Sequence, residues 1–492
     1  MGPITTPVEN TAGNMFPNKE VLVQESPLSR ADHAEERRIV MKTDAVVLSF
    51  IVLLAFLMFL DKNCLAYAAI LGMKTDTHLV GQEYSWLGSI FYFGYLLGMP
   101  VSAFLIIKIP VGRLFGAAAT CWGVTMMCMS ACHSFAGLAT VRFFLGLLEA
   151  PAFPSAMILI GNWWKRSEQP LRTALWYNTF AGIFGGLLAF GINNLHGALP
   201  NWRYLFLIYG SATIIVGSLA FFFLPVSPAT AWFLTAREKE IAIARLADTQ
   251  QKNNNDQPTK FQISQCVEAL LSAKYWVLLA GVMAQGVTAS GITNFNPLII
   301  KGFGYSVQRT NLLAAPQAAV GIAGQVIFSI LAYYIPNTRC LWWMIGTLPA
   351  LAGAVIIHTV DVNTQRTVAL GGVYLMGFYN VGFVMAIAIA TANNRGSTKR
   401  PFVNASMGVS LAVSEIFGPQ FFRNSQAPYY SLGIWALVVC YAFMVVTGGI
   451  YWLLAVLANR KRDRMVQAAD ITPVSIDEDL TDGQNKALRY SY

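Results

Sequence analysis

Long apolar runs alternate with short polar segments over most of this chain. The runs lie at about 44–68, 84–107, 112–132, 136–160, 172–194, 204–224, 274–300, 310–334, 339–359, 367–392, 402–422 and 430–457. A helix needs about 20 apolar residues to cross the hydrocarbon core of a bilayer, and each run has roughly that length. The pattern therefore predicts an all-α membrane protein with twelve transmembrane helices.

The twelve runs form two sets of six, separated by one polar stretch. We expect a disordered tail at 1–43, a six-helix bundle at 44–224, a central loop at 225–273, a second six-helix bundle at 274–457 and a tail at 458–492. In the central loop the sequence predicts one short helix near Arg237 to Leu246. Two matched bundles are typical of transporters built from repeats, whose solute site lies between the halves.

The composition narrows the class of protein further. Hydrophobic residues make up 55% of the chain and charged residues 12%, whereas soluble domains average about 25% charged residues. The net charge of +9 comes from basic residues at the ends of apolar runs, which argues against nucleic-acid binding. The seven cysteines show no metal-site spacing, and no His or Cys constellation suggests an enzyme. We expect no metal and no cofactor.

Loop charges predict how the chain sits in its membrane. The loops after the second, fourth, eighth and tenth runs hold nine Lys and Arg residues, and the opposite short loops hold six. The two tails add basic residues on the richer side: Arg30, Arg37, Arg38, Lys42, Arg460, Lys461, Arg462 and Arg464. Because the side with more Lys and Arg faces the cytoplasm, we expect both termini there. By analogy with other transporters, the plasma membrane is the expected location.

Ionisable residues inside the apolar runs are the candidate functional residues. Five stand out: Asp61, Lys62, Arg142, Glu149 and Glu415. Each costs about 2.5 to 3.5 kcal/mol on insertion, so such a residue usually serves a function. A structural alternative remains, in which Asp61 and Lys62 extend to the outer interface and Arg142 only joins two helices.

The depths of three of these residues favour a shared site. Asp61 lies 17 residues after Asp44, which marks the inner end of the first run. Arg142 lies about two turns below the outer end of the fourth run, which is antiparallel to the first. Both residues are therefore expected at the same depth in the membrane. Glu149 follows Arg142 by seven residues on the same face, roughly 10 Å deeper. A buried carboxylate beside an Arg can load and release a proton as the pair forms and breaks. The Arg fork also matches a carboxylate solute.

Two polar residues of the second half are further candidates for solute binding. Glu415 could face the centre of the protein or pair with a neighbouring helix, and Asn380 could bind solute or another helix. The sequence leaves these alternatives open.

The fourth run carries a motif of a known family. Arg142-Phe143-Phe144-Leu145-Gly146-Leu147-Leu148-Glu149-Ala150, with Pro154, resembles the signature of major facilitator superfamily transporters, and most closely that of the fungal allantoate permease-like anion:cation symporters. The resemblance implies proton-coupled uptake of a small organic anion, with Asp61 and Glu149 as proton sites and Arg142 holding the anion. Lys62 departs from the Arg usual in the family, and Tyr209 replaces a common Glu.

These observations together predict a secondary active transporter, monomeric in the lipid bilayer, that carries a proton with a small organic anion by alternating access. Lys62, Asn380 and Glu415 join Arg142 as expected solute-binding residues. Two alternatives remain: an exporter or exchanger of an anionic metabolite, and a sensor that binds solute without moving it.

Overall fold

The computed structural model describes residues 30–165, 167–176, 180–254, 261–468, 480–485 and 488–492, and every regular element within them is helical. Nine helical segments of this described part are long and apolar enough to cross a membrane. Three more occupy the remaining predicted positions: α5 (Val111–Met129), the pair α8 (Gln169–Trp176) and α9 (Phe180–Asn193), and α18 (Lys399–Phe417). The twelve-helix prediction is therefore confirmed.

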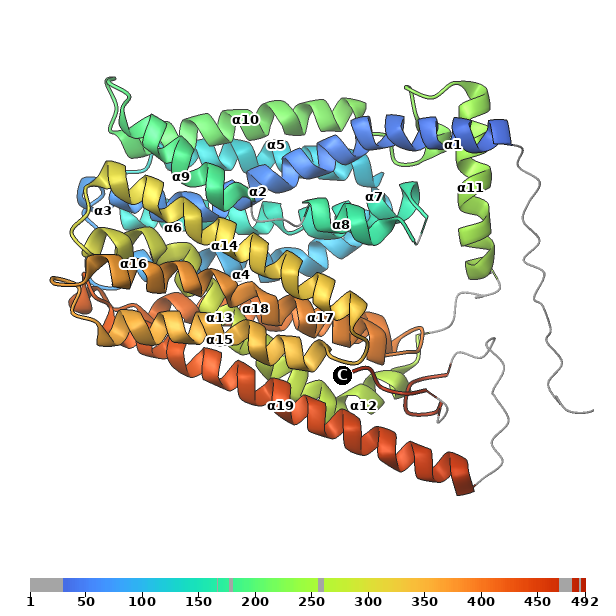
Figure 1. Cartoon of the computed structure of the whole chain (residues 1–492). Coiled ribbons are helices and arrows are strands. Elements are labelled where there is room, and N and C mark those ends of the chain that lie inside the picture. Colours follow the sequence, from blue (N-terminus) through green and yellow to red (C-terminus); the bar gives the residue numbers. More distant parts are fainter. Residues whose placement is uncertain (1–29, 166, 177–179, 255–260, 469–479, 486–487) are drawn as a thin grey trace, which may run out of the picture.

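Six helical positions form the first bundle, which lies mostly above the second in Figure 1. Besides α5 and the pair α8 and α9, they are η1 (Asp44–Leu48) with α2 (Ser49–Ile70), α4 (Glu83–Lys108), α6 (Phe135–Glu149) with α7 (Ala152–Trp163), and α10 (Asn201–Phe223). A short α3 (Met73–Asp76) follows α2. The Ser134 hydroxyl caps α6 by accepting from the Gly137 amide.

The second bundle repeats this layout. Besides α18, its helices are α13 (Ala273–Gly302), α14 (Val307–Tyr334), α15 (Arg339–Thr359), α16 (Arg366–Leu375) with η3 (Met376–Asn380) and α17 (Val381–Asn393), and α19 (Ser431–Ala468). Short η4 (Gly418–Phe421) and η5 (Asn424–Gln426) connect α18 to α19. In both bundles the fourth helix is interrupted.

The segments outside the bundles are more ordered than the sequence suggested. Residues 30–43 were expected to be disordered but form α1 (Arg30–Thr43), which runs directly into the first bundle; residues 1–29 lie outside the described part. The central loop contains η2 (Pro228–Thr230), a longer helix than predicted, α11 (Ala236–Asn254), and an additional one, α12 (Ile263–Leu271). Charged side chains join these helices to each other and to the bundles, which the polar sequence alone did not indicate.

The two bundles hydrogen-bond to each other near one of the two ends of the molecule. We call the end that carries α1, α11 and α12 the tail side, and the opposite end the far side (Figure 1). Across the bundle interface, α2 packs against α13, α4 against α18 and α9 against α14. Toward the far side the Tyr84 hydroxyl donates to the Asn294 carbonyl at 2.7 Å, and the Ser89 hydroxyl donates to the Ile416 carbonyl at 2.6 Å. The structure therefore represents a form whose bundles meet on the far side.

Candidate functional site

Five buried or half-buried ionisable side chains gather between the two bundles. Asp61 and Lys62 come from α2, Arg142 and Glu149 from α6, and Glu415 from α18. Glu149 is fully buried, and Asp61 and Arg142 are almost fully buried. The structure thus brings together the five residues that the sequence analysis singled out by their cost in lipid.

Lys62 and Glu149 form the central ion pair of this cluster. The Lys62 Nζ lies 3.2 Å from the Glu149 Oε1. The same ammonium lies 5.7 Å from the ring centroid of Tyr95, 5.8 Å from that of Phe91 and 5.9 Å from that of Phe59. An ammonium within about 6 Å of a ring face is attracted by the ring quadrupole. Lys62 is therefore held inside the protein and does not extend to the membrane surface.

Asp61 and Arg142 form the second part of the cluster. Arg142 and Lys62 both attract the Asp61 carboxylate, and Glu149 repels it. The side chain of Trp122 also interacts with the Asp61 carboxylate. Among the described residues, however, the two Asp61 oxygens, the Trp122 Nε1 and the Arg142 Nε make no hydrogen bond of standard geometry. Buried polar atoms are usually hydrogen-bonded, so these atoms are available for a proton, a water molecule or a solute.

Glu415 extends the cluster into the second bundle. Its carboxylate interacts with Tyr92 on α4, with Ser290 on α13 and with Lys62 on α2. Lys62 consequently faces one carboxylate in its own bundle and one across the bundle interface. Glu415 therefore interacts both with a neighbouring helix of its own bundle and with residues across the bundle interface.

Close packing of α4 on α6 places the aromatic residues beside the charges. A Cβ on Gly94 would overlap the Phe143 carbonyl, and one on Gly146 would overlap the Phe91 carbonyl. The two backbones can approach this closely because both positions lack a side chain. Because Phe91 lies at this close contact, its position on α4 is near the face of α6 that carries Arg142 and Glu149.

The interrupted fourth helices contribute one candidate residue each. Glu149 ends α6, and Pro151, which has no N–H to continue the hydrogen-bond ladder, follows in the turn. Asn380 ends the corresponding 3₁₀ turn of the second bundle, where its side-chain oxygen accepts from the Gln285 amide at 3.3 Å. Interrupted helices at matched positions of two repeats are typical of solute sites in transporters.

The structure adds pairings that the sequence analysis did not specify. Asp61, Arg142 and Glu149 lie within electrostatic reach of one another, as expected, and Lys62 lies between Glu149 and Glu415 as their shared cation. Asn380 bonds to Gln285 within its own bundle, and no contact described here joins it to the five charges. The sequence analysis missed Tyr92, Tyr95 and Trp122; the aromatic run around Gly94 was the available signal for the first two.

The cluster contains more acidic than basic side chains. Asp61, Glu149 and Glu415 are acids, whereas Lys62 and Arg142 are bases, so the fully ionised group has one net negative charge. An uncompensated charge in a buried site is costly. Binding one proton would make the group neutral.

Comparisons with known proteins agree on one family. A model of the Major Facilitator Superfamily matches residues 51–419. An uncharacterized transporter of Schizosaccharomyces pombe is 32% identical over 467 residues, which cover 93% of this chain and 88% of that one. An allantoate permease of Saccharomyces cerevisiae is 30% identical over 487 residues, covering 96% of this chain and 89% of the permease.

Solved structures share the fold at much lower identity. A bacterial homologue of the human lysosomal transporter Spinster, in an inward-facing conformation, matches with a TM-score of 0.61 at 15% identity and covers 83% of this chain and 96% of that one. A D-xylose-proton symporter matches with a TM-score of 0.59 at 12% identity, covering 82% and 96%.

Proposed function

The chain belongs to the major facilitator superfamily, and we propose that this transporter couples the movement of a proton to that of a small organic anion. Transporters with two repeat bundles move solute by rocking one bundle against the other around a site near the midplane. The buried charges lie where such a site is expected, between α2, α6 and α18.

One observation carries the proposal: the buried cluster has three carboxylates and two cations. One proton neutralises the empty site. A monovalent anion that enters adds a negative charge, which a second proton compensates. Each anion would therefore bring one proton with it, because the site is costly to leave charged in a low dielectric.

Within this scheme the residues have distinct roles. Asp61 and Glu149 exchange the proton, because both are buried carboxylates next to a cation that a solute can compete for. Arg142 offers a planar fork for a carboxylate, and Lys62 a point charge. Asn380 and Glu415 line the solute from the second bundle.

The name of one relative supports a small organic anion as the kind of solute. The yeast relative is named as a permease for allantoate, which is a carboxylate. Another yeast relative, 30% identical over 480 residues, is named as a thiamine pathway transporter, so the superfamily branch is not restricted to one solute. The replacement of an expected Arg by Lys62 argues for a solute that differs from allantoate in the geometry of its anionic group.

The distribution of charge supports an orientation in the membrane. We infer that the tail side is cytoplasmic, with both termini inside, because Lys and Arg are more numerous in the loops of that side. A monomer in the plasma membrane is proposed by analogy with other transporters. An epitope tag at either end should be inaccessible to antibody on intact cells and accessible after permeabilisation. Labelling of intact cells at either terminus would contradict this orientation.

Uptake into proteoliposomes tests the coupling itself. The purified protein should accumulate at least one member of a panel of small radiolabelled carboxylates when the outside is acidic, and the uptake should carry protons that an internal pH dye detects. A protonophore should abolish the accumulation. Accumulation that persists without a pH gradient would contradict proton coupling, and flux driven only outward by external acid would indicate an exporter.

A further inference from the structure

Two groups of polar contacts on the tail side hold equivalent loops of the two bundles. In each bundle the loop concerned connects the fourth and fifth helices. Its described residues are Trp164, Lys165, Ser167 and Glu168 before α8, and residues 394–398 before α18. In each, the loop is held by a segment that precedes the bundle and a segment that follows it. We call these groups the first clamp (Glu36, Lys165, Glu168, Arg245) and the second clamp (Glu268, Thr398, Lys399, Thr481, Asp482).

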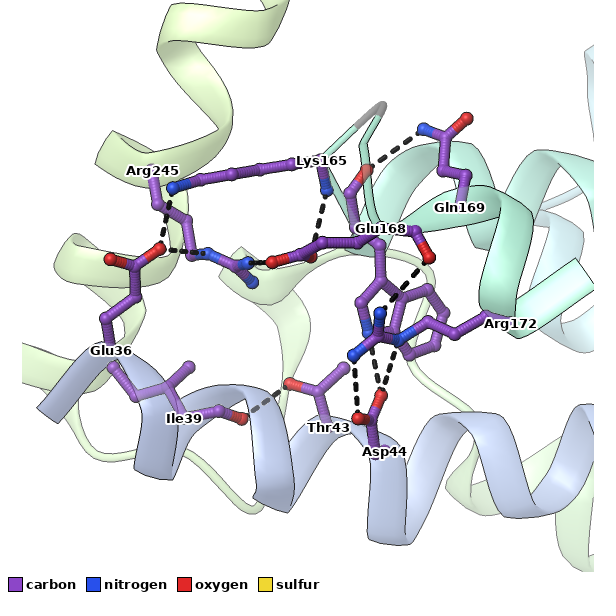
Figure 2. A network of polar contacts seen from close by, with 10 residues as sticks. Glu36, Ile39, Thr43, Asp44, Lys165, Glu168, Gln169, Arg172 and Arg245 are labelled. Carbon is purple, nitrogen blue, oxygen red and sulfur yellow. Dashed lines mark hydrogen bonds and ion pairs between the residues drawn. The ribbon is translucent and has the colours of Figure 1, made fainter. Parts of the chain in front are cut away.

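The first clamp joins α1, α11 and the loop before α8 (Figure 2). The Glu36 Oε1 lies 2.6 Å from the Lys165 Nζ and 3.1 Å from the Arg245 Nε. A second nitrogen of Arg245 lies 2.5 Å from the Glu168 Oε1. The Arg245 side chain is only 3% exposed, so these are more than surface ion pairs.

A bidentate pair extends the first clamp toward the membrane. Arg172 on α8 binds both oxygens of Asp44 at 2.7 Å, and the Trp164 Nε1 donates to the same carboxylate at 2.8 Å (Figure 2). The loop is thus fixed at both of its ends to the helix that enters the bundle.

The second clamp joins α12, the last residues of the chain and the loop before α18. The Lys399 Nζ lies 2.9 Å from the Glu268 Oε1 and 2.6 Å from the Asp482 Oδ1. The Thr481 hydroxyl donates to the Glu268 Oε2 at 2.7 Å. The Gln265 side-chain oxygen accepts from the backbone amides of Thr398 and Lys399 at 3.0 Å each.

The two clamps match in layout, and each has a buried cation at its centre that pairs with two acids. In the first clamp this cation is Arg245 on α11, which pairs with Glu36 and Glu168. The buried centre of the second is Lys399, shared between two acids and 3% exposed. The C-terminal segment also reaches α15, α17 and α19, because Tyr492, Ser491 and Tyr490 bond to Arg339, Asn393 and Asn459.

We propose that the two clamps stabilise the present form, in which the bundles meet on the far side, and thereby set how readily the bundles come together on the tail side. In the present form, the bundles hydrogen-bond to each other toward the far side, and the clamps satisfy the loop charges within each bundle. Alternating access requires the bundles to approach on the tail side instead. If the charges of a loop are already paired inside its own bundle, the approach of the other bundle adds less favourable electrostatic free energy.

The charges that the clamps retain are complementary between the bundles. Release of the first clamp frees the acid Glu168, and release of the second frees the base Lys399. These opposite charges would attract each other across the closing tail side. Arg245 and Asp482 are therefore positioning residues, which act through the two loops and not on the solute.

Distances between the loops test this without any solute. In a chain whose native cysteines are replaced, spin labels at the exposed positions Ser167 and Arg395 report the separation of the loops in lipid nanodiscs. Arg245→Gln and Asp482→Asn should each raise the ratio of short to long distances by about fivefold or more. This is the lower end of the change in an equilibrium that a typical coupling between two sites produces. Arg245→Lys and Asp482→Glu, which keep the charge, should restore much of the original distribution.

The chain offers a matched control for each clamp. Arg237 pairs with Glu35 at 3.1 Å between the same two helices, and Arg489 pairs with Asp463 at 2.7 Å between the C-terminal segment and α19, yet neither pair includes a loop residue. Arg237→Gln and Arg489→Gln should leave the distances unchanged. Glu268→Gln gives an independent release of Lys399 in the second clamp if a clamp variant does not fold, whereas Glu168→Gln removes the acid that would attract Lys399 and should not raise the ratio.

The proposal is overturned if the clamp variants, folded by size-exclusion chromatography, keep the distances of the controls or shift to longer ones. Because the readout needs neither solute nor proton gradient, this failure is distinct from a failure of the proposed proton coupling.

Discussion

The two bundles contribute different chemistry to the interface between them. The first bundle supplies four ionisable residues, Asp61, Lys62, Arg142 and Glu149, whereas the second supplies Glu415. Under the proposed coupling, this contrast separates proton exchange from solute binding. Proton exchange needs titratable groups at short range, and the first bundle concentrates such groups around a single pair of helices.

The second bundle is rich in buried neutral polar groups instead. Gln285, Asn311 and Gln317 are at most 5% exposed, and each has a side-chain amide atom without a hydrogen-bond partner among the residues described. Buried amides that lack a partner are costly, so such groups commonly bind a ligand or water. The comparison teaches that most of the buried charge of the cluster lies in the first bundle, whereas the second bundle contributes mainly neutral hydrogen-bonding groups.

The largest expected effect concerns Glu149. Glu149→Gln keeps the shape and the hydrogen-bonding capacity of the protonated acid, so solute exchange between the two sides should persist while accumulation driven by a pH gradient is lost. Radiolabelled uptake and counterflow in the same proteoliposomes measure both. Glu415→Gln is the matched control in the second bundle and should retain accumulation; loss of coupling in both variants would break the contrast between the bundles.

Arg142 should control anion affinity more than coupling. Arg142→Gln removes the fork that pairs with a carboxylate and leaves Asp61 without its cation, so the Kd for the anion should rise about 30-fold or more. Calorimetric titration of the solubilised protein would measure this change. An unchanged Kd would show that Arg142 does not bind the anion and only holds α2 and α6 together.

Lys62 should tolerate a change of shape better than a loss of charge. Lys62→Arg keeps a cation between Glu149 and Glu415 and should retain part of the transport rate, whereas Lys62→Ala leaves two buried acids facing each other and should lose most of it, about tenfold or more. Initial rates at saturating solute separate the variants. Wild-type activity of Lys62→Ala would show that the ion pair is dispensable.

The smallest effect is expected in the second bundle. Gln285→Ala removes one neutral hydrogen bond to Asn380 and should weaken solute binding by about threefold to tenfold, the range of a single neutral hydrogen bond. The dependence of uptake on external pH should be unchanged. A shifted pH profile in this variant would mean that the second bundle also takes part in proton exchange.

Most of the fold could be predicted from the sequence because membrane insertion is governed by local properties. The length of an apolar run decides whether a helix can cross the bilayer, and all twelve predicted positions are helical. The same cost of burial identified Asp61, Lys62, Arg142, Glu149 and Glu415 as candidates, because a charge in an apolar run is visible without any structure.

The segments outside the bundles were harder to predict. Residues 30–43, 480–485 and 488–492 are mostly polar and resemble disordered tails by composition. Their order depends on partners far away in sequence, such as Lys165 for Glu36 and Lys399 for Asp482. A polar segment that is stabilised by ion pairs carries no periodic signal of its own.

The sequence by itself therefore determined the helices, their grouping into two bundles and the identity of the buried charges, because hydrophobic length and the cost of burying a charge are properties of single residues and short runs. Only the tertiary structure decided which charges meet. Lys62 pairs with Glu149 and faces Glu415 because α2, α6 and α18 pack together at that level, and no spacing along the chain encodes this meeting. Ion pairs act over a few ångströms in space, so their partners are fixed by packing.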